Sequence, residues 1–184
     1  GVLQIDAHAD LRDEYEGTPF SHACVMRRVR ELCPATQVGV RSLSEEESAL
    51  MAKERLRVFL DKDLAGARAA TGKPKWVAEV VQTLPDEVYV TIDLDGLDPA
   101  IMPSVGTPEP GGLGWYDTLR LLRAVAQKKR IIGFDVVELC PNPTNIGPDF
   151  LAAKLTYKLI GYARLLCPSK RRGSAGAGPK RLPS

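Results

Sequence analysis

Long apolar runs are absent from this 184-residue sequence. No stretch approaches the roughly 18 to 20 apolar residues that a membrane-spanning helix needs, and residues 1–6 have neither the basic stretch nor the apolar core of a signal peptide. The four cysteines form no C-x-x-C pair, so their spacing predicts neither a zinc knuckle nor a redox dithiol. These absences favour a protein of the reducing cytoplasm that does not bind membranes.

Acidic residues are missing from the last 17 positions, 168–184, which hold five basic residues. Without this segment the chain has 20 basic against 23 acidic residues, a net charge of −3 instead of +2. The body therefore lacks the basic footprint of a nucleic-acid-binding protein. Because the segment is rich in Gly, Pro, Ser and Ala, we expect one domain over residues 1–167 and a basic, low-complexity, disordered tail over 168–184. A solvated extension is favoured over a phosphate-binding arm.

The body does contain a regular alternation of short apolar runs and longer amphipathic stretches. The apolar, strand-like runs lie at residues 2–5, 37–40, 56–60, 88–94 and 131–137, and helical spacing occurs at residues 22–32, 45–53, 75–84, 116–127 and 149–166. This order predicts an α/β fold, a three-layer α-β-α sandwich whose mostly parallel sheet has strands that are apolar throughout. Ligands of such sheets bind beyond the carboxyl ends of the strands.

Two of the apolar runs end abruptly in clusters of acids. Residues 6–10 read Asp-Ala-His-Ala-Asp, and Asp93 and Asp95 follow the run over residues 88–92 with the same two-residue offset. Alternate residues of an extended segment point to one side, so the acids of each cluster can converge. Either cluster alone is weak evidence, because such strings are common at helix caps and turns. Together they predict a metal site made of Asp6, His8, Asp10, Asp93 and Asp95.

The chemistry of these side chains indicates which metal they suit. Four carboxylates and one imidazole at buried strand ends would repel one another and resist desolvation unless cations were present. Oxygen-rich ligation with a minority of imidazole suits manganese better than zinc. Two such ions about 3.5 to 4 Å apart can share a water molecule and lower its pKa towards neutrality. We therefore expect a pair of Mn²⁺ ions.

The motifs around these acids resemble those of the ureohydrolase family, which comprises arginases, agmatinases and relatives that hydrolyse guanidino groups to urea. The resemblance rests on residues 6–10, Ser21-His22, residues 91–99 (Thr-Ile-Asp-Leu-Asp-Gly-Leu-Asp-Pro) and residues 106–112 (Gly-Thr-Pro-Glu-Pro-Gly-Gly), and it extends from residue 2 to about residue 164. It implies an arginase-like α/β sandwich, in agreement with the alternation above. It also implies a homo-oligomer, either a trimer or a hexamer.

The resemblance assigns a role to each predicted ligand. The aspartates that match Asp6 and Asp93 bridge two manganese ions in the family, and those that match Asp10 and Asp95 each serve one ion. The histidine that matches His8 serves the second ion. Asp98-Pro99 and Gly111-Gly112 are expected to shape the loop and not to take part in the chemistry.

Two further side chains are candidates for catalysis. From its surroundings alone, His22 is an exposed or capping histidine beside Ser21 as readily as a functional one; the resemblance makes it a proton shuttle beside the metals. Glu138 ends the run over residues 131–137, where a carboxylate can hold a planar guanidinium through paired hydrogen bonds, as the matching family glutamate does. We expect structural roles for Asp135 and for Cys140, the latter as a small buried residue.

The residues after the first acidic cluster indicate the substrate. Residues 15–24 resemble agmatinases more than arginases, because they lack the polar pattern with which arginases grip an α-carboxylate and an α-amine. The expected reaction is the hydrolysis of agmatine to putrescine and urea, a step of polyamine synthesis. The alternatives are an arginase or guanidinobutyrase activity, a non-catalytic ureohydrolase-like subunit, and another dinuclear hydrolase such as a phosphoesterase. No basic cluster near these loops supports the phosphoesterase.

The chain departs from the family in its length and in one ligand. Family members are longer and carry an upstream Gly-Gly-Asp-His motif whose histidine completes the first ion's ligands, whereas His8 and His22 are the only histidines here. We therefore expect the carboxyl-terminal part of a ureohydrolase, without its N-terminal strands and with an exposed sheet edge and apolar surface. Such a chain should be weakly active or inactive alone.

Overall fold

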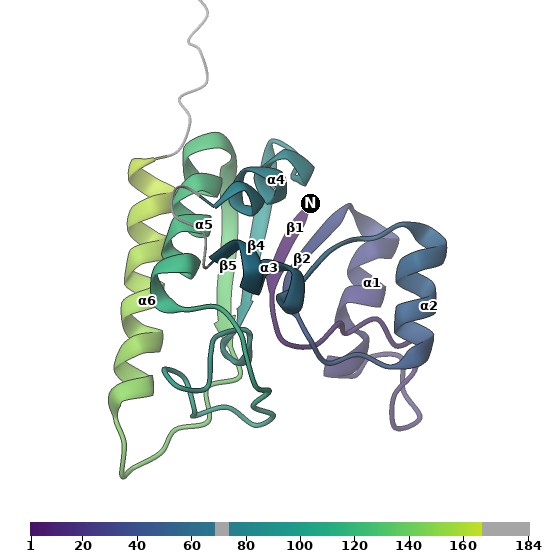
Figure 1. The fold of residues 1–184 in the computed structure, drawn as a ribbon, viewed down its shortest axis with the longest axis horizontal. Coiled ribbons are helices and arrows are strands. Elements are labelled where there is room, and N and C mark those ends of the chain that lie inside the picture. Colours follow the sequence, from purple (N-terminus) through teal and green to yellow (C-terminus); the bar gives the residue numbers. More distant parts are fainter. Residues whose placement is uncertain (69–73, 167–184) are drawn as a thin grey trace, which may run out of the picture.

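The computed structural model describes residues 1–68 and 74–166, and its centre is one five-stranded sheet (Figure 1). All neighbouring strands are parallel, and their spatial order is β3-β2-β1-β4-β5. The strands are β1 (Val2–Ile5), β2 (Ala35–Val40), β3 (Arg57–Leu60), β4 (Glu87–Asp93) and β5 (Arg130–Val137). The predicted parallel α/β sheet is confirmed, and each strand lies within two residues of its predicted bounds.

Helices alternate with these strands along the chain. They are α1 (Val25–Leu32), α2 (Glu45–Glu54), α3 (Asp61–Arg68), α4 (Lys75–Thr83), α5 (Trp115–Lys128) and α6 (Gly147–Leu165), with short 3-10 turns η1 (His22–Cys24) and η2 (Leu94–Gly96). The sequence pattern missed only α3, a short helix that directly follows β3 and buries Leu64. Within the described residues, no helix combines the length and apolar character needed to cross a bilayer. The expected tail, residues 168–184, lies outside the described residues.

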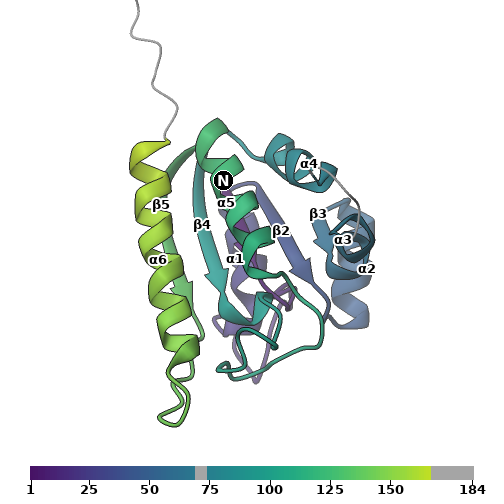
Figure 2. The same ribbon diagram turned by 60° about the vertical axis from the view of Figure 1, so that its left-hand side comes forward.

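Two separate cores make the fold a three-layer sandwich. The larger core lies between the sheet and α4, α5 and α6, and the smaller one, around Met26 and Val40, lies between the opposite face and α1 and α2. Figure 1 shows α1 and α2 on one side of the sheet and α5 and α6 on the other, and Figure 2 shows α5 and α6 alongside β4 and β5.

The expectation of strands that are apolar throughout is wrong for one face of the sheet. Gln4 and Gln37 are 3% and 2% exposed, and a row of polar side chains crosses four strands in register. This polar row consists of Gln37, Gln4, Thr91 and Asp135. Asp135 accepts hydrogen bonds from Thr91 Oγ1 at 2.6 Å and from Tyr89 at 2.9 Å, consistent with its expected structural role. Cys140 is exposed, so the expectation that it is buried is wrong.

The order of the strands creates a place for a ligand. From β1 the chain adds β2 and β3 on one side, and then returns to place β4 and β5 on the other side. Connections therefore diverge between β1 and β4, and a crevice opens there at the carboxyl ends of the two strands. Both acidic clusters begin at this switch point.

Candidate functional site

A cavity of about 430 Å³ lies at the switch point between β1 and β4. Ile5 and Ile92 are partners in register, so the acids that follow them come from neighbouring strands. The cavity is lined by all seven side chains that the sequence predicts for the site, namely Asp6, His8, Asp10, His22, Asp93, Asp95 and Glu138. The fold therefore brings the whole predicted set to one place.

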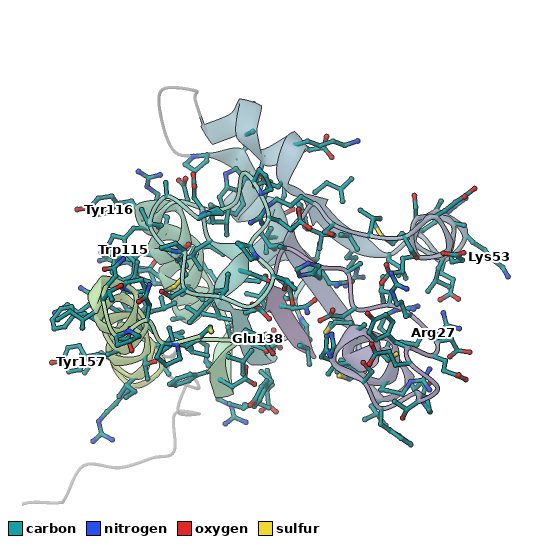
Figure 3. All side chains as sticks on the ribbon, turned by 90° about the horizontal axis from the view of Figure 1, so that it is seen from below. Arg27, Lys53, Trp115, Tyr116, Glu138 and Tyr157 are labelled. Carbon is teal, nitrogen blue, oxygen red and sulfur yellow. The ribbon has the colours of Figure 1, made fainter. Side chains whose placement is uncertain are left out.

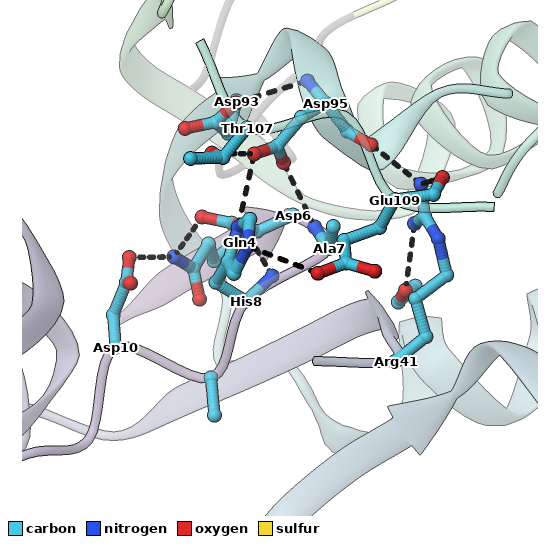
Figure 4. A network of polar contacts seen from close by, with 12 residues as sticks. Gln4, Asp6, Ala7, His8, Asp10, Arg41, Asp93, Asp95, Thr107 and Glu109 are labelled. Atoms are coloured by element: carbon cyan, nitrogen blue, oxygen red, sulfur yellow. Dashed lines mark hydrogen bonds and ion pairs between the residues drawn. The ribbon is translucent and has the colours of Figure 1, made fainter. Parts of the chain in front are cut away.

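The tightest group within the cavity consists of Asp6, His8 and Asp95. One ligand-type atom from each lies within 4.8 Å of the others. His8 Nδ1 is 2.9 Å from Asp95 Oδ2 and 3.5 Å from Asp6 Oδ1, so the imidazole lies between the two carboxylates (Figure 4). One residue of the first cluster thus links the two clusters directly.

Backbone N–H groups hold three of the carboxylates in place. The amide of Ala7 donates to Asp95 Oδ1 at 3.0 Å, that of His8 donates to Asp6 Oδ1 at 2.6 Å, and that of Asp95 donates to Asp93 Oδ1 at 2.9 Å. The bond from Ala7 joins the segment after β1 to η2. The two clusters are therefore fixed to each other before any cation binds.

The electrostatics of the site show an excess of buried negative charge. Burial, followed by repulsion from Asp6, raises the pKa of Asp10 to about 8 and that of Asp93 to about 9. Burial also raises the pKa of Asp6. Hydrogen bonds to Asp6 and Asp95 raise the pKa of His8 to about 10. Burial is the largest influence on Asp95 and acts to raise its pKa, but the hydrogen bonds from His8 and Ala7 and the charge of His8 together outweigh burial and lower the pKa. Protons thus compensate the acids, and divalent cations can replace those protons.

Two of the predicted site residues have left-handed backbone conformations. Asp10 has a φ of 54° and Glu138 a φ of 64°, and among the described residues only Glu16 and Arg55 join them as non-glycine residues with positive φ. Such conformations cost roughly 1 to 3 kcal/mol each and persist where surrounding contacts enforce them, often at functional sites. Both side chains line the cavity, Glu138 directly after β5 and Asp10 five residues beyond the end of β1.

His22 and Glu138 also line the cavity but do not belong to the tight group. His22 begins η1, is exposed, and its ring meets that of Tyr15 edge-on with 5.7 Å between centroids. Its Nδ1 lies 3.4 Å from Ser21 Oγ. Glu138 follows β5, and Figure 3 shows it in the middle of the molecule between the α1–α2 side and the α5–α6 side.

Sequence reasoning missed several side chains that support the site. Thr107 Oγ1 donates to Asp95 Oδ2 at 3.3 Å, and Glu109 Oε1 lies 3.9 Å from His8 Nε2. Gln4 and Gln37 were recognisable as polar residues within apolar runs. Arg41 carried no comparable signal, because four of its five partners lie more than 50 residues away along the chain.

Arg41 joins three loops around the site. It follows β2 and donates to five carbonyl oxygens, at 2.7 Å to Asp95, 2.9 Å to Glu109, 3.0 Å to Pro110, 3.2 Å to Gly39 and 3.4 Å to Leu97. Gly111 and Gly112 close the same loop with φ of 88° and 105°, and a Cβ on Gly112 would lie 2.7 Å from the carbonyl carbon of Leu97. The expected shaping role of the glycine pair agrees with this geometry.

We expect Arg41→Met to lower the free energy of unfolding by about 2 to 4 kcal/mol, because it leaves several partly buried carbonyls without a donor. Arg41→Lys should lose less, since an ammonium offers three donors without the planar fork. Chemical denaturation measures both effects. Arg123→Met, on the exposed side of α5, is the matched control. Equal stabilities for Arg41→Met and the control would contradict the bracing role.

The sequence of this chain is similar to those of known proteins over most of its length. The model of the arginase family matches residues 1–161. The chain belongs to the arginase family. It is 45% identical over 163 residues to the N(1)-aminopropylagmatine ureohydrolase of Synechocystis sp., covering 88% of this chain and 51% of that protein. It is also 36% identical over 159 residues to the agmatinase of Pyrococcus horikoshii, covering 86% and 53% respectively.

Solved structures of the arginase family have the same fold. The agmatine ureohydrolase of Thermoplasma volcanium superimposes with a TM-score of 0.76 and 36% identity, over 88% of this chain and 54% of that one. The chain spans about half the length of the curated relatives it matches. The predicted resemblance to ureohydrolases is therefore confirmed as family membership.

Proposed function

We propose that this site hydrolyses a guanidino group to urea and an amine, with two Mn²⁺ ions as cofactor. The observation that carries the proposal is that five side chains of a type that can bind metals, three of them with a raised carboxyl pKa, line one cavity with Glu138. Membership of the arginase family supports it, as do the ureohydrolase names of the relatives. We further propose that residues 1–167 are the catalytic domain.

The donor set fits a pair of divalent ions, because its buried carboxylates outnumber the cations near them. Asp6 and Asp93 would serve both ions, Asp10 the first, and His8 and Asp95 the second. When bound, the Mn²⁺ pair supplies a nucleophile at neutral pH by lowering the pKa of water. The protein's contribution is to hold these acids together at the carboxyl ends of two strands.

The remaining side chains would bind the substrate and move protons. Glu138 would hold the planar guanidinium through paired, charge-assisted hydrogen bonds and so keep its carbon facing the metal-binding acids. Loss of urea leaves a strongly basic amine, which needs a proton to depart. His22, exposed at the cavity wall beside Tyr15, would carry that proton between solvent and the site.

Agmatine is the first proposed substrate, since residues 15–24 resemble agmatinases; its products would be putrescine and urea. N(1)-aminopropylagmatine is the second, because the Synechocystis relative at 45% identity is named for it. Both have an unbranched chain without an α-carboxylate, so the same cavity would serve either guanidino group. A homo-oligomer stays a prediction from the resemblance, and a location in the cytoplasm stays a prediction from the sequence pattern.

The test is manganese-dependent urea release from agmatine, N(1)-aminopropylagmatine, arginine and 4-guanidinobutyrate, with bound Mn²⁺ counted in the same sample. The Synechocystis enzyme is the positive control, and a phosphate ester tests the phosphoesterase alternative. Urea from either of the first two compounds supports the proposal. Two bound Mn²⁺ ions without urea from any guanidino compound would instead favour the non-catalytic subunit.

We expect Glu138→Gln to lower kcat/KM for the preferred guanidino substrate by about 10² to 10³-fold, because an amide cannot form the charged pair with a guanidinium. Mn²⁺ affinity should stay unchanged, since Glu138 is not among the proposed ligands. Calorimetry with agmatine and with Mn²⁺ separates the two effects. Glu79→Gln, exposed on α4, is the matched control. Lost Mn²⁺ binding in Glu138→Gln would place Glu138 among the ligands and contradict its proposed role.

A further inference from the structure

Two glutamines lie buried beneath the proposed metal ligands. Gln4 in β1 and Gln37 in β2 are partners in register and are 3% and 2% exposed. Burying an unpaired amide costs several kcal/mol, so glutamines in the centre of a sheet need partners. Such breaks in an apolar pattern concentrate at functional sites.

The partners of Gln4 are the two carboxylates proposed to serve the first ion. Gln4 Nε2 donates to Asp6 Oδ2 at 2.7 Å and to Asp10 Oδ2 at 3.0 Å (Figure 4). An amide nitrogen carries two protons, so both are used. One side chain thus spans the two acids and fixes the distance between them.

Gln37 sets the orientation of Gln4. Its Nε2 donates to Gln4 Oε1 at 2.6 Å and to the carbonyl of Ala9 at 2.7 Å. A flipped Gln4 amide would direct its oxygen at two carboxylates and its nitrogen at the Gln37 donor, which removes all three hydrogen bonds of the Gln4 side chain. Gln37 therefore always donates to Gln4, and Gln4 always donates to the two acids.

We infer that Gln4, oriented by Gln37, is a positioning residue that holds Asp6 and Asp10 in the spacing needed for the first Mn²⁺ ion. This inference rests on the proposed function, because that function supplies the ion. The ion held with His8 and Asp95 depends less on Gln4, since these two side chains contact each other and Asp95 also accepts a hydrogen bond from the amide of Ala7. Outer partners of metal ligands commonly change metal affinity by about 10 to 100-fold.

Mn²⁺ titration followed by electron paramagnetic resonance tests the inference on the full chain. Methionine matches glutamine in length and lacks its hydrogen-bond donors. In Gln4→Met, one Mn²⁺ ion should therefore bind about 10 to 100-fold less tightly than in the wild-type protein, and the other should bind with unchanged affinity. Gln37→Met should act in the same direction, and its effect should be less than additive with that of Gln4→Met, because it acts through Gln4. Gln127→Met, exposed on α5, is the control. Two ions bound to Gln4→Met with wild-type affinity would overturn the inference.

A second measurement does not depend on the metal. In the metal-free protein, the side-chain N–H groups of Gln4 and Gln37 should exchange slowly with solvent by NMR, and Gln4→Met should accelerate exchange at Gln37. Fast exchange at both glutamines in the wild-type protein would overturn the inference. A wild-type chain that binds no Mn²⁺ but protects both amides would count against the proposed function alone.

Discussion

Asp6→Asn is expected to remove both Mn²⁺ ions from the site and to lower any manganese-dependent urea release by roughly 10³-fold or more. Asp6 contacts His8, accepts a hydrogen bond from Gln4 and lies near Asp93 and Asp95, and it is one of the two carboxylates proposed to serve both ions. Asparagine keeps an oxygen for the His8 amide but lacks the charge. Bound manganese, counted after gel filtration, is the direct measurement.

The control for this substitution lies at the opposite end of the sheet. Asp86 precedes β4 and is fully exposed, so Asp86→Asn removes one acid of the same kind without touching the cavity. Its manganese content should equal that of the wild-type protein. Retention of both ions by Asp6→Asn would refute the bridging role and leave Asp93 as the only shared ligand.

The metal-free protein is expected to lose stability as pH rises from 5.5 to 8.5 (roughly the window between the ordinary and the raised carboxyl pKa values). Asp10 and Asp93 have folded-state pKa values of about 8 and about 9, against an ordinary 3.8. Within this window the folded state keeps protons that the unfolded state has released. Each such proton lowers the free energy of unfolding by about 1.4 kcal/mol per pH unit.

The other groups of the site do not reverse this trend. The pKa of His8 is raised to about 10 from 6.5, so its stabilising contribution is present below pH 6.5 and is also lost as pH rises through about 10. Mn²⁺ replaces the protons, so the increase in Tm that it causes should grow with pH. Thermal melts at three pH values, with and without Mn²⁺, measure both trends.

Asp93→Asn tests how proton binding and Mn²⁺ binding at this carboxylate each contribute to stability. It should flatten the pH dependence of the metal-free protein and stabilise that protein at pH 8.5, since a partly buried acid near other acids is gone. It should also abolish the stabilisation by Mn²⁺. Asp86→Asn should change neither trend. A metal-free wild-type protein that becomes more stable as pH rises would contradict the raised pKa values and the fit of the site to divalent ions.

Sequence reasoning predicted the parts of the site that depend on neighbouring strand ends. Asp6 and Asp93 converge because they follow apolar runs whose carboxyl ends meet at one edge of a parallel sheet, a relation that local pattern reveals. Helix α3 was missed because Asp61–Arg68 is short and, among its described side chains, only Asp61 and Leu64 are buried. A pattern of single residues does not contain the contacts of Arg41 with Asp95 and Glu109, because these depend on how distant loops fold over β2.

The left-handed backbone conformations of Asp10 and Glu138 could not be predicted from the sequence either. Neither residue type requires positive φ, so only the surrounding contacts select it. In Asp10, the backbone carbonyl accepts from the amides of Met26 and Arg27 at the start of α1, while the side chain accepts from Gln4. The position of this proposed ligand is thus decided by tertiary structure.

The polar row across the sheet has a consequence for how the strands find their alignment during folding. A slip of β4 by one residue against β1 would reverse the faces of β4, sending Thr91 and Asp93 into the apolar core and Val90 towards Gln4. An all-apolar sheet would tolerate such a slip far better, because hydrocarbon side chains make few directional demands. The polar row of Gln37, Gln4, Thr91 and Asp135 therefore favours one strand register. Sheets with a shifted register are destabilised, and the correct register places the two acidic clusters side by side.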